Sequence, residues 1–226
     1  MLHTIVRLRV VAMLLCAVIA FSVTAAPAPV YKPKPPRVWF DGWDDPIDKA
    51  GGCKITRKGE KLTLIVPGSN PGNPALLLRE VEGDFVLEVR VSSESDSAVC
   101  VGDRKAGVVL VIDGTHSRMN RVTEAGVGIV SGLFRSELTV NRQSMGCAVG
   151  ILGQNIANIS HFRVRRKGNE LIWEAKEDGT EWTTMNNGFT ALALPKKIKI
   201  GVSAEATAPG PFNVEFDQFR LTKPAK

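Results

Sequence analysis

Apolar and polar residues alternate with a period of two over much of the chain that follows residue 37. The alternation is clearest over 61–66, 85–92, 162–165, 197–204 and 212–217. Successive side chains of a β-strand point to opposite faces, so this pattern predicts strands with one buried and one solvated face. Such strands are typical of antiparallel sheets. The segment 108–112 is apolar throughout and predicts a central strand buried on both faces.

Turn signals separate these runs at short intervals. Gly168 lies in one of them and Gly179 in another, and no long stretch shows a capped 3.6-residue period. After Asp217 the apolar residues fall out of phase, which predicts a β-bulge near 217–218. We expect about eleven to thirteen strands. The predicted fold class is all-β, with two packed antiparallel sheets forming a sandwich or jelly roll as a single domain over residues 38–223.

Residues 1–25 have the pattern of a secretory signal peptide. Arg7 and Arg9 precede an apolar run over 10–23, and small residues allow cleavage after Ala25. An uncleaved N-terminal anchor is the alternative. Residues 26–37 hold five prolines and predict an extended linker. The product is expected to be exported to the periplasm, cell surface or exterior, with no transmembrane anchor after signal cleavage.

The charge of the chain argues against a nucleic-acid partner. The formal net charge is +6, and it falls to +4 once the signal takes Arg7 and Arg9 with it. That excess is mild and dispersed, whereas nucleic-acid binding needs a concentrated basic surface. Lys and Arg on the solvated faces either attract an anionic polysaccharide or protect the sheets from aggregation.

Three cysteines remain after signal cleavage. Cys100 and Cys147 both lie in short apolar runs, and an oxidising compartment permits one disulfide between them, with Cys53 free. The alternative is three buried, unpaired cysteines.

Several segments resemble one family. They cover 74–91, 106–110, 162–169, 178–182 and 212–221. Together they resemble the bacterial concanavalin A-like jelly-roll domains of unassigned function that are related to the C-terminal domain of β-xylosidases. Residues 45–53 are similar to the start of secreted, planctomycete-type members. The resemblance spans about 38–222 and implies the fold, but no activity; the segment 114–160 departs most from the family pattern.

The sequence shows no catalytic constellation. Glycosidases of the concanavalin A-like superfamily carry acids in the order Glu-x-Asp-x-x-Glu, which places two carboxylates for acid–base work. The nearest match is Glu215-Phe216-Asp217, where the third acid is missing and the residues fall on the family's closing strand. We therefore expect no catalytic residue. A glycan hydrolase with a non-standard site stays open as an alternative.

Carbohydrate binding is the favoured function. Sugars stack their C–H faces on aromatic rings, and polar groups at the edges orient them. The candidate ligand-binding residues are Trp43 and Trp39 for stacking, with Arg118 and Asn120 supplying hydrogen bonds from loops. The expected partner is a polysaccharide or an envelope glycan. A purely structural or protein-interaction domain is the other alternative.

A structural calcium ion is the one cofactor that stays open. Asp41 lies near the start of the expected domain and Asp217 near its end, and the first and last strands of such sandwiches often meet. Carboxylate oxygens are the ligands that Ca²⁺ prefers. The alternative is a solvated acidic loop.

Overall fold

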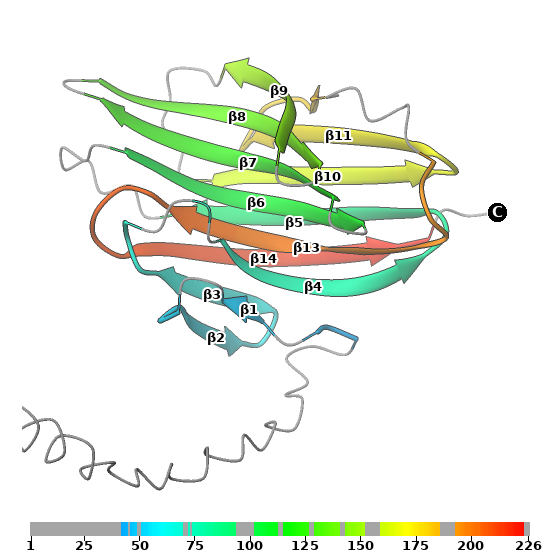
Figure 1. Ribbon diagram of the computed structural model, residues 1–226, viewed down its shortest axis with the longest axis horizontal. Helices are drawn as coiled ribbons and strands as arrows, with labels where there is room; N and C mark the ends of the chain where they lie inside the picture. Colours follow the sequence, from blue (N-terminus) through cyan, green and yellow to red (C-terminus); the bar gives the residue numbers. More distant parts are fainter. Residues whose placement is uncertain are drawn as a thin grey trace, which may run out of the picture. The chain divides into compact units, whose positions relative to one another are not determined.

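The computed structural model describes residues 42–44, 46–48, 51–69, 72, 74–93, 102–112, 115–126, 129–140, 143–151, 159–185 and 193–223. These residues form fourteen strands and no helix, which confirms the all-β prediction (Figure 1). The ranges named here contain no helix that is long and apolar enough to cross a membrane. The proposed signal peptide and linker lie outside them, so both stay predictions.

The first sheet has seven antiparallel strands. Their spatial order is β1 (Ile47–Asp48), β4 (Ala75–Glu82), β13 (Lys197–Ala206), β6 (Gly102–Ile112), β7 (Thr115–Gly126), β8 (Ile129–Val140) and β9 (Gln143–Ile151). The strands β6 to β9 follow one another along the chain and in space. A late strand, β13, is inserted between the early strands β4 and β6, which ties the two ends of the domain together.

The second sheet also has seven antiparallel strands. Their order is β12 (Thr183–Thr184), β11 (Glu170–Glu177), β10 (Ile159–Lys167), β5 (Phe85–Ser93), β14 (Phe212–Thr222), β3 (Lys61–Val66) and β2 (Lys54–Lys58). The total of fourteen exceeds the predicted eleven to thirteen. The excess comes from β1 and β12, which have two residues each and are too short to show a period-two pattern.

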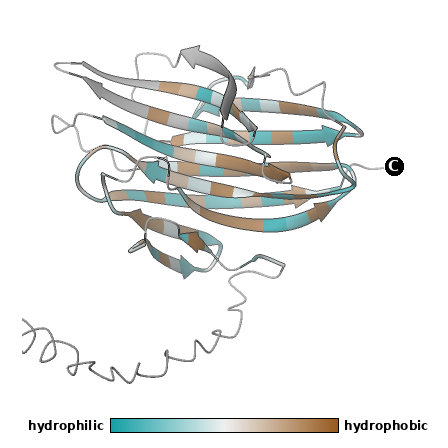
Figure 2. Ribbon diagram, in the orientation of Figure 1, coloured by the Kyte–Doolittle hydropathy of each residue, from teal (hydrophilic) through white to brown (hydrophobic). Residues whose placement is uncertain are grey.

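One apolar core lies between the two sheets. In β5 every second residue from Phe85 to Val91 is buried, and the residues between them are partly exposed, as the alternation predicts. Figure 2 shows hydrophobic and hydrophilic residues interleaved along the strands. Phe134 of β8 meets Phe162 of β10 edge to face at 5.6 Å, so the two sheets interlock. Each fully buried Leu, Val or Phe side chain contributes about 1.5–3 kcal/mol to folding.

The central strand and the bulge lie at the positions that the sequence predicts. In β6, Val108 faces the core, and Val109 is buried on the opposite face in a small cluster with Leu76 and Leu78. The pairing of β14 with β5 shifts between Asp217 and Arg220, which confirms the predicted bulge. Both predicted glycine turns are present as well, because Gly168 and Gly179 have positive φ angles in tight hairpins.

Candidate functional site

Polar side chains gather on the face of the first sheet that points away from the core. In β13 the even-numbered residues from Ile198 to Ala206 are buried in the core, so the odd-numbered residues point outward. Cross-strand pairing aligns one outward row across four strands: Ser203, Gly107, Asn120 and Arg135. The neighbouring row consists of Gly201, Val109, Arg118 and Glu137.

Two positions in the middle of this face, Gly107 and Gly201, carry no side chain. A Cβ atom on Gly107 would lie 2.0 Å from the carbonyl oxygen of Met119, and one on Gly201 would lie 1.9 Å from that of Leu77. Neither position therefore accepts a side chain without moving the backbone of the neighbouring strand. The polar side chains of the flanking residues project beside two positions that have none.

Among the described residues, Arg118 and Glu205 form the most enclosed ion pair of this face. The Nη1 atom of Arg118 donates to Oε2 of Glu205 at 3.0 Å, and the two side chains are 14% and 7% exposed. The backbone N–H of Gly72 donates to the other carboxylate oxygen at 2.7 Å. Both oxygens of Glu205 are thus engaged, which holds the carboxylate in one orientation.

A second group of charges lies beside this pair. Lys105 Nζ is 3.7 Å from Asp103 and 3.8 Å from Glu137, and Arg135 Nη1 is 3.9 Å from the same Glu137 oxygen. These separations exceed hydrogen-bond length, so the attraction is mainly Coulombic. The side chains are partly exposed, at 16% to 30%.

The uncharged polar residues of this face are buried more deeply. Asn120 and Ser203 are each 2% exposed, and the Ser203 hydroxyl donates to the Asn120 side-chain oxygen at 3.4 Å. They lie in the same row on either side of Gly107. We call the residues of these three groups the polar network: Arg118, Glu205, Gly107, Lys105, Asp103, Glu137, Arg135, Asn120 and Ser203.

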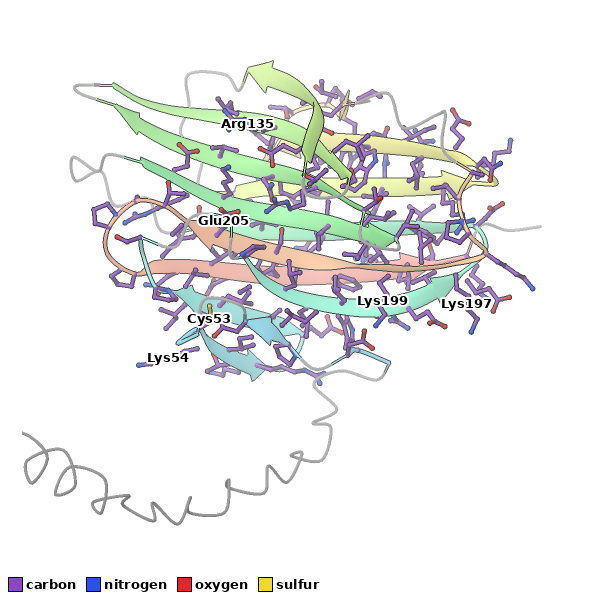
Figure 3. All side chains as sticks on the ribbon, in the orientation of Figure 1. Cys53, Lys54, Arg135, Lys197, Lys199 and Glu205 are labelled. Carbon is purple, nitrogen blue, oxygen red and sulfur yellow. The ribbon has the colours of Figure 1, made fainter. Side chains whose placement is uncertain are left out.

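The polar network is electrically balanced. It contains three cations and three acids, and each of them lies within 4 Å of an opposite charge. Figure 3 shows Glu205 on β13 and Arg135 on β8, so its side chains come from strands far apart in sequence. A balanced array of fixed donors and acceptors suits a ligand rich in hydroxyl groups and without net charge.

The structure brings two of the predicted ligand residues together. Arg118 and Asn120 both lie in the polar network, two residues apart on the same face of β7. Their expected placement in a loop is wrong, because Thr115–Gly126 is a twelve-residue strand. The segment lacks clear hydrophobic alternation because the polar Ser117 is buried on the same face as the core residue Met119, while the apolar Val122 is buried on the opposite face.

Trp43, the aromatic candidate that the structure describes, is not part of this network. Trp43 is half-buried and packs against the core, with its ring 4.6 Å from that of Phe219. The hollow beside it is lined by core-facing residues such as Leu77 and Phe216, not by the outward residues of the sheet. Trp39 lies outside the described residues. Trp43 is therefore held by a packing contact, and its role in stacking stays a prediction.

Asp217 is poorly placed as a calcium ligand. One of its oxygens accepts a hydrogen bond from Arg90 Nη1 at 2.7 Å, and the guanidinium charge disfavours a second cation there. Among the described residues no group of three or more His, Cys, Asp or Glu side chains forms a metal site. Asp41 lies outside those residues. The calcium ion thus stays a prediction that Asp217 alone does not support.

Of the cysteines, only Cys53 has a described side chain, and it is a free thiol. Its backbone N–H donates to Asp48 at 2.9 Å. Burial, reinforced by the hydrogen bond and negative charge of Asp48, raises the pKa of the Cys53 thiol to about 12. Cys100 lies outside the described residues and Cys147 is described through its backbone alone, so their disulfide stays a prediction.

Sequence reasoning missed most of the polar network. Ser203 and Glu205 appear in the sequence as the solvated residues of a strand, and Lys105, Arg135 and Glu137 appear as isolated charges. The available signal was the pair of polar residues in the otherwise apolar end of β13. This pair of polar residues does not show which strand lies next to β13. The neighbouring strand determines which charged side chains come into contact.

No protein-family model matches the sequence, and no curated protein matches it either. Solved structures do match. A protein of unknown function from Saccharomyces cerevisiae is 20% identical, with a TM-score of 0.63 over 82% of this chain and 98% of its own. The carbohydrate-binding module CBM66 from Bacillus subtilis is 10% identical, with a TM-score of 0.53 over 80% of this chain and 96% of its own.

A xylan β-1,4-xylosidase from Bacillus halodurans also matches. It is 12% identical, with a TM-score of 0.53 over 85% of this chain but 41% of the xylosidase. At such identities the likeness shows the fold alone, and it agrees with the family resemblance of the sequence motifs. The two seven-stranded antiparallel sheets of this protein therefore form a jelly-roll sandwich of the kind seen in these solved structures.

Proposed function

We propose that the protein is an exported, non-catalytic carbohydrate-binding domain that holds a neutral glycan on the polar network of the first sheet. The observation that carries the proposal is the charge-balanced arrangement of Arg118 with Glu205 and of Arg135 with Glu137 on the outward face of adjacent strands. The shared fold with a carbohydrate-binding module supports it. Export rests on residues 1–25 alone.

The chemistry of recognition would be hydrogen bonding rather than stacking on Trp43. Carboxylates such as Glu137 accept from sugar hydroxyls, and cations such as Lys105 and Arg135 donate to hydroxyl and ring oxygens. The groups are already held by each other, so a ligand would not have to order them.

The test is retention of the purified protein on a panel of immobilised neutral polysaccharides at low and at high salt. We expect retention on at least one polymer, with little loss at high salt, because the ligand carries no net charge. The variant that replaces Arg118 and Glu205 by Gln together removes the pair without leaving one buried charge. It should weaken retention about tenfold or more, since it removes hydrogen bonds to charged groups.

The matched control replaces Lys61 and Glu215 by Gln. That pair is also a single ion pair, at 2.7 Å, but it is 45% and 40% exposed on the second sheet. It should bind as the unmodified protein does. If no neutral polysaccharide is retained, or if both double variants bind equally well, the polar network is not a glycan site.

A further inference from the structure

A separate pocket of about 50 Å³ opens on the outer face of the second sheet. It lies over β10, β5 and β14, which are neighbours in that sheet (Figure 1). The polar side chains that line it are Glu88, Arg90, His161, Gln218 and Arg220, and the ring of Trp182 lines it as well. The polar network is on the outer face of the other sheet, so this pocket is a distinct place on the molecule.

Most charges around this pocket are already neutralised. Arg90 donates to Asp217 at 2.7 Å, and His161 bonds to Asp178 at 2.6 Å. Arg163 makes two bonds to Glu174, at 2.7 and 2.8 Å, and lies 3.7 Å from Glu88. Arg220 differs from them: it is exposed and lies opposite Glu88 in the sheet, but within the described ranges it has no ion pair within 4 Å and no hydrogen bond. Arg220 is therefore a cation at this pocket that can pair with a ligand.

The bulge in β14 is what directs Arg220 to this face. Asp217 points outward, and regular alternation would place Phe219 outward and Arg220 toward the core. The extra residue reverses that order: Phe219 packs inward against Trp43, and Arg220 comes to lie opposite Glu88. Gln218 adopts a φ of 50° to allow this, which costs about 1 kcal/mol or more for a residue that is not glycine.

Trp182 supplies an aromatic ring at the same pocket. It is half-buried, and two cations fix it, with the Arg163 guanidinium 4.2 Å and Lys176 Nζ 5.1 Å from the ring centre. Cations in these positions are attracted by the electron-rich ring face and limit its motion. An ordered aromatic ring beside an unpaired guanidinium is a combination that contacts an apolar sugar surface and an anion at once.

The size of the pocket limits what enters it. A pocket needs a volume of about 10–15 Å³ to hold one water molecule. The 50 Å³ of this pocket therefore accommodates a group of about three or four heavy atoms rather than a sugar ring. A carboxylate fits that space. The ring that carries it would then rest at the rim, where Trp182 is.

We propose that this pocket binds the carboxylate of an acidic sugar unit, with Arg220 pairing with the carboxylate and Trp182 contacting the sugar ring. The site is independent of the polar network and takes the opposite kind of ligand, an anionic glycan rather than a neutral one. The protein would thus have one glycan-binding surface on each sheet.

The test is calorimetric titration of the purified protein with trimers of galacturonate, glucuronate and mannuronate, each also supplied as its methyl ester. The ester keeps the sugar and removes the charge, so it should bind at least tenfold more weakly. Arg220→Ala should weaken binding of the acid by about tenfold or more, and Arg220→Lys by less, because Lys keeps the charge without the planar fork. Lys197→Ala, which removes an exposed cation from the other sheet, should have no effect.

Trp182→Ala should weaken binding as well, and near-ultraviolet circular dichroism checks that this variant is folded. If Trp182→Ala unfolds, the Arg220 variants still provide the test, because Arg220 is exposed. Inorganic sulfate is the competitor that separates an acidic sugar from a simple anion. The proposal is wrong if none of the three acids binds, if ester and acid bind equally, if Arg220→Ala has no effect, or if sulfate competes as strongly as the trimer. Replacement of Arg118 and Glu205 by Gln should leave this binding unchanged, so failure here is separable from failure of the neutral-glycan site.

Discussion

Arg118 and Glu205 are eighty-seven residues apart in the chain, yet their side chains meet at 3.0 Å across the strand that lies between theirs. Glu205 is opposite Lys105 and Arg118 is opposite Val109, so the pair crosses β6 at the level of Gly107. The absence of a side chain at Gly107 leaves this path open. The ion pair thus connects β13 to β7 across Gly107.

Breaking this pair on one side should destabilise the protein. Arg118→Gln or Glu205→Gln leaves one enclosed charge without its partner, which should lower the free energy of unfolding by about 2–3 kcal/mol, somewhat less than for a fully buried pair. The double variant should lose less than the sum of the two. Urea unfolding of all four proteins checks this. A strictly additive result would show that the two charges do not interact.

The glycines of the same face should tolerate no side chain. Gly107→Ala and Gly201→Ala each place a Cβ within about 2 Å of a backbone oxygen. Either substitution should lower the free energy of unfolding by about 3 kcal/mol or more. Gly168→Ala is the comparison, because its Cβ meets nothing within 4 Å and its cost of about 1 kcal/mol comes only from the positive φ. Thermal unfolding compares them, and equal losses at the three positions would contradict the packing argument.

Stability should depend on pH through Glu174. Burial opposes ionisation of this carboxylate, but hydrogen bonds from Arg163 and Arg165 outweigh burial and hold the pKa of Glu174 below its ordinary value of 4.5. A depressed folded-state pKa stabilises the protein above the unfolded value, and this contribution is lost as the pH falls through the folded value.

Glu174→Gln should therefore lower the free energy of unfolding by about 2 kcal/mol at pH 7 and by progressively less below pH 4.5. Urea unfolding at several pH values from 7 to 3 measures the difference between variant and parent. The exposed Glu215→Gln provides a variant in which this difference should stay small throughout. A constant difference for Glu174→Gln would mean that its charge is not what stabilises the fold.

Cys53 should react slowly with alkylating agents. The thiolate is the reactive form, and the raised pKa of about 12 leaves very little of it at pH 8. We expect iodoacetamide to modify Cys53 at least about 100-fold more slowly in the folded protein than in urea, as followed on the peptide that carries it. Asp48→Asn removes the negative charge beside the thiol and should speed the reaction. An unchanged rate in that variant would assign the protection to burial alone.

Local patterns were sufficient for the elements of this fold. The alternation in β5 and β10, the glycine turns and the bulge after Asp217 were all predicted, because a period of two and a change of phase are properties of a few consecutive residues. The failure at β7 has the same origin. Its polar residues interrupt the pattern, so a twelve-residue strand was expected to be a turn-like loop.

The sequence by itself determined that this chain is a two-sheet β-sandwich with Arg118 and Asn120 among its binding candidates. The tertiary structure alone decided that β13 lies between β4 and β6, and hence that Glu205 meets Arg118 and Ser203 meets Asn120. It also decided that Trp43 packs on Phe219 while Arg220 faces solvent beside Trp182. Strand order and register depend on contacts between residues far apart in the chain, and no local periodicity carries that information.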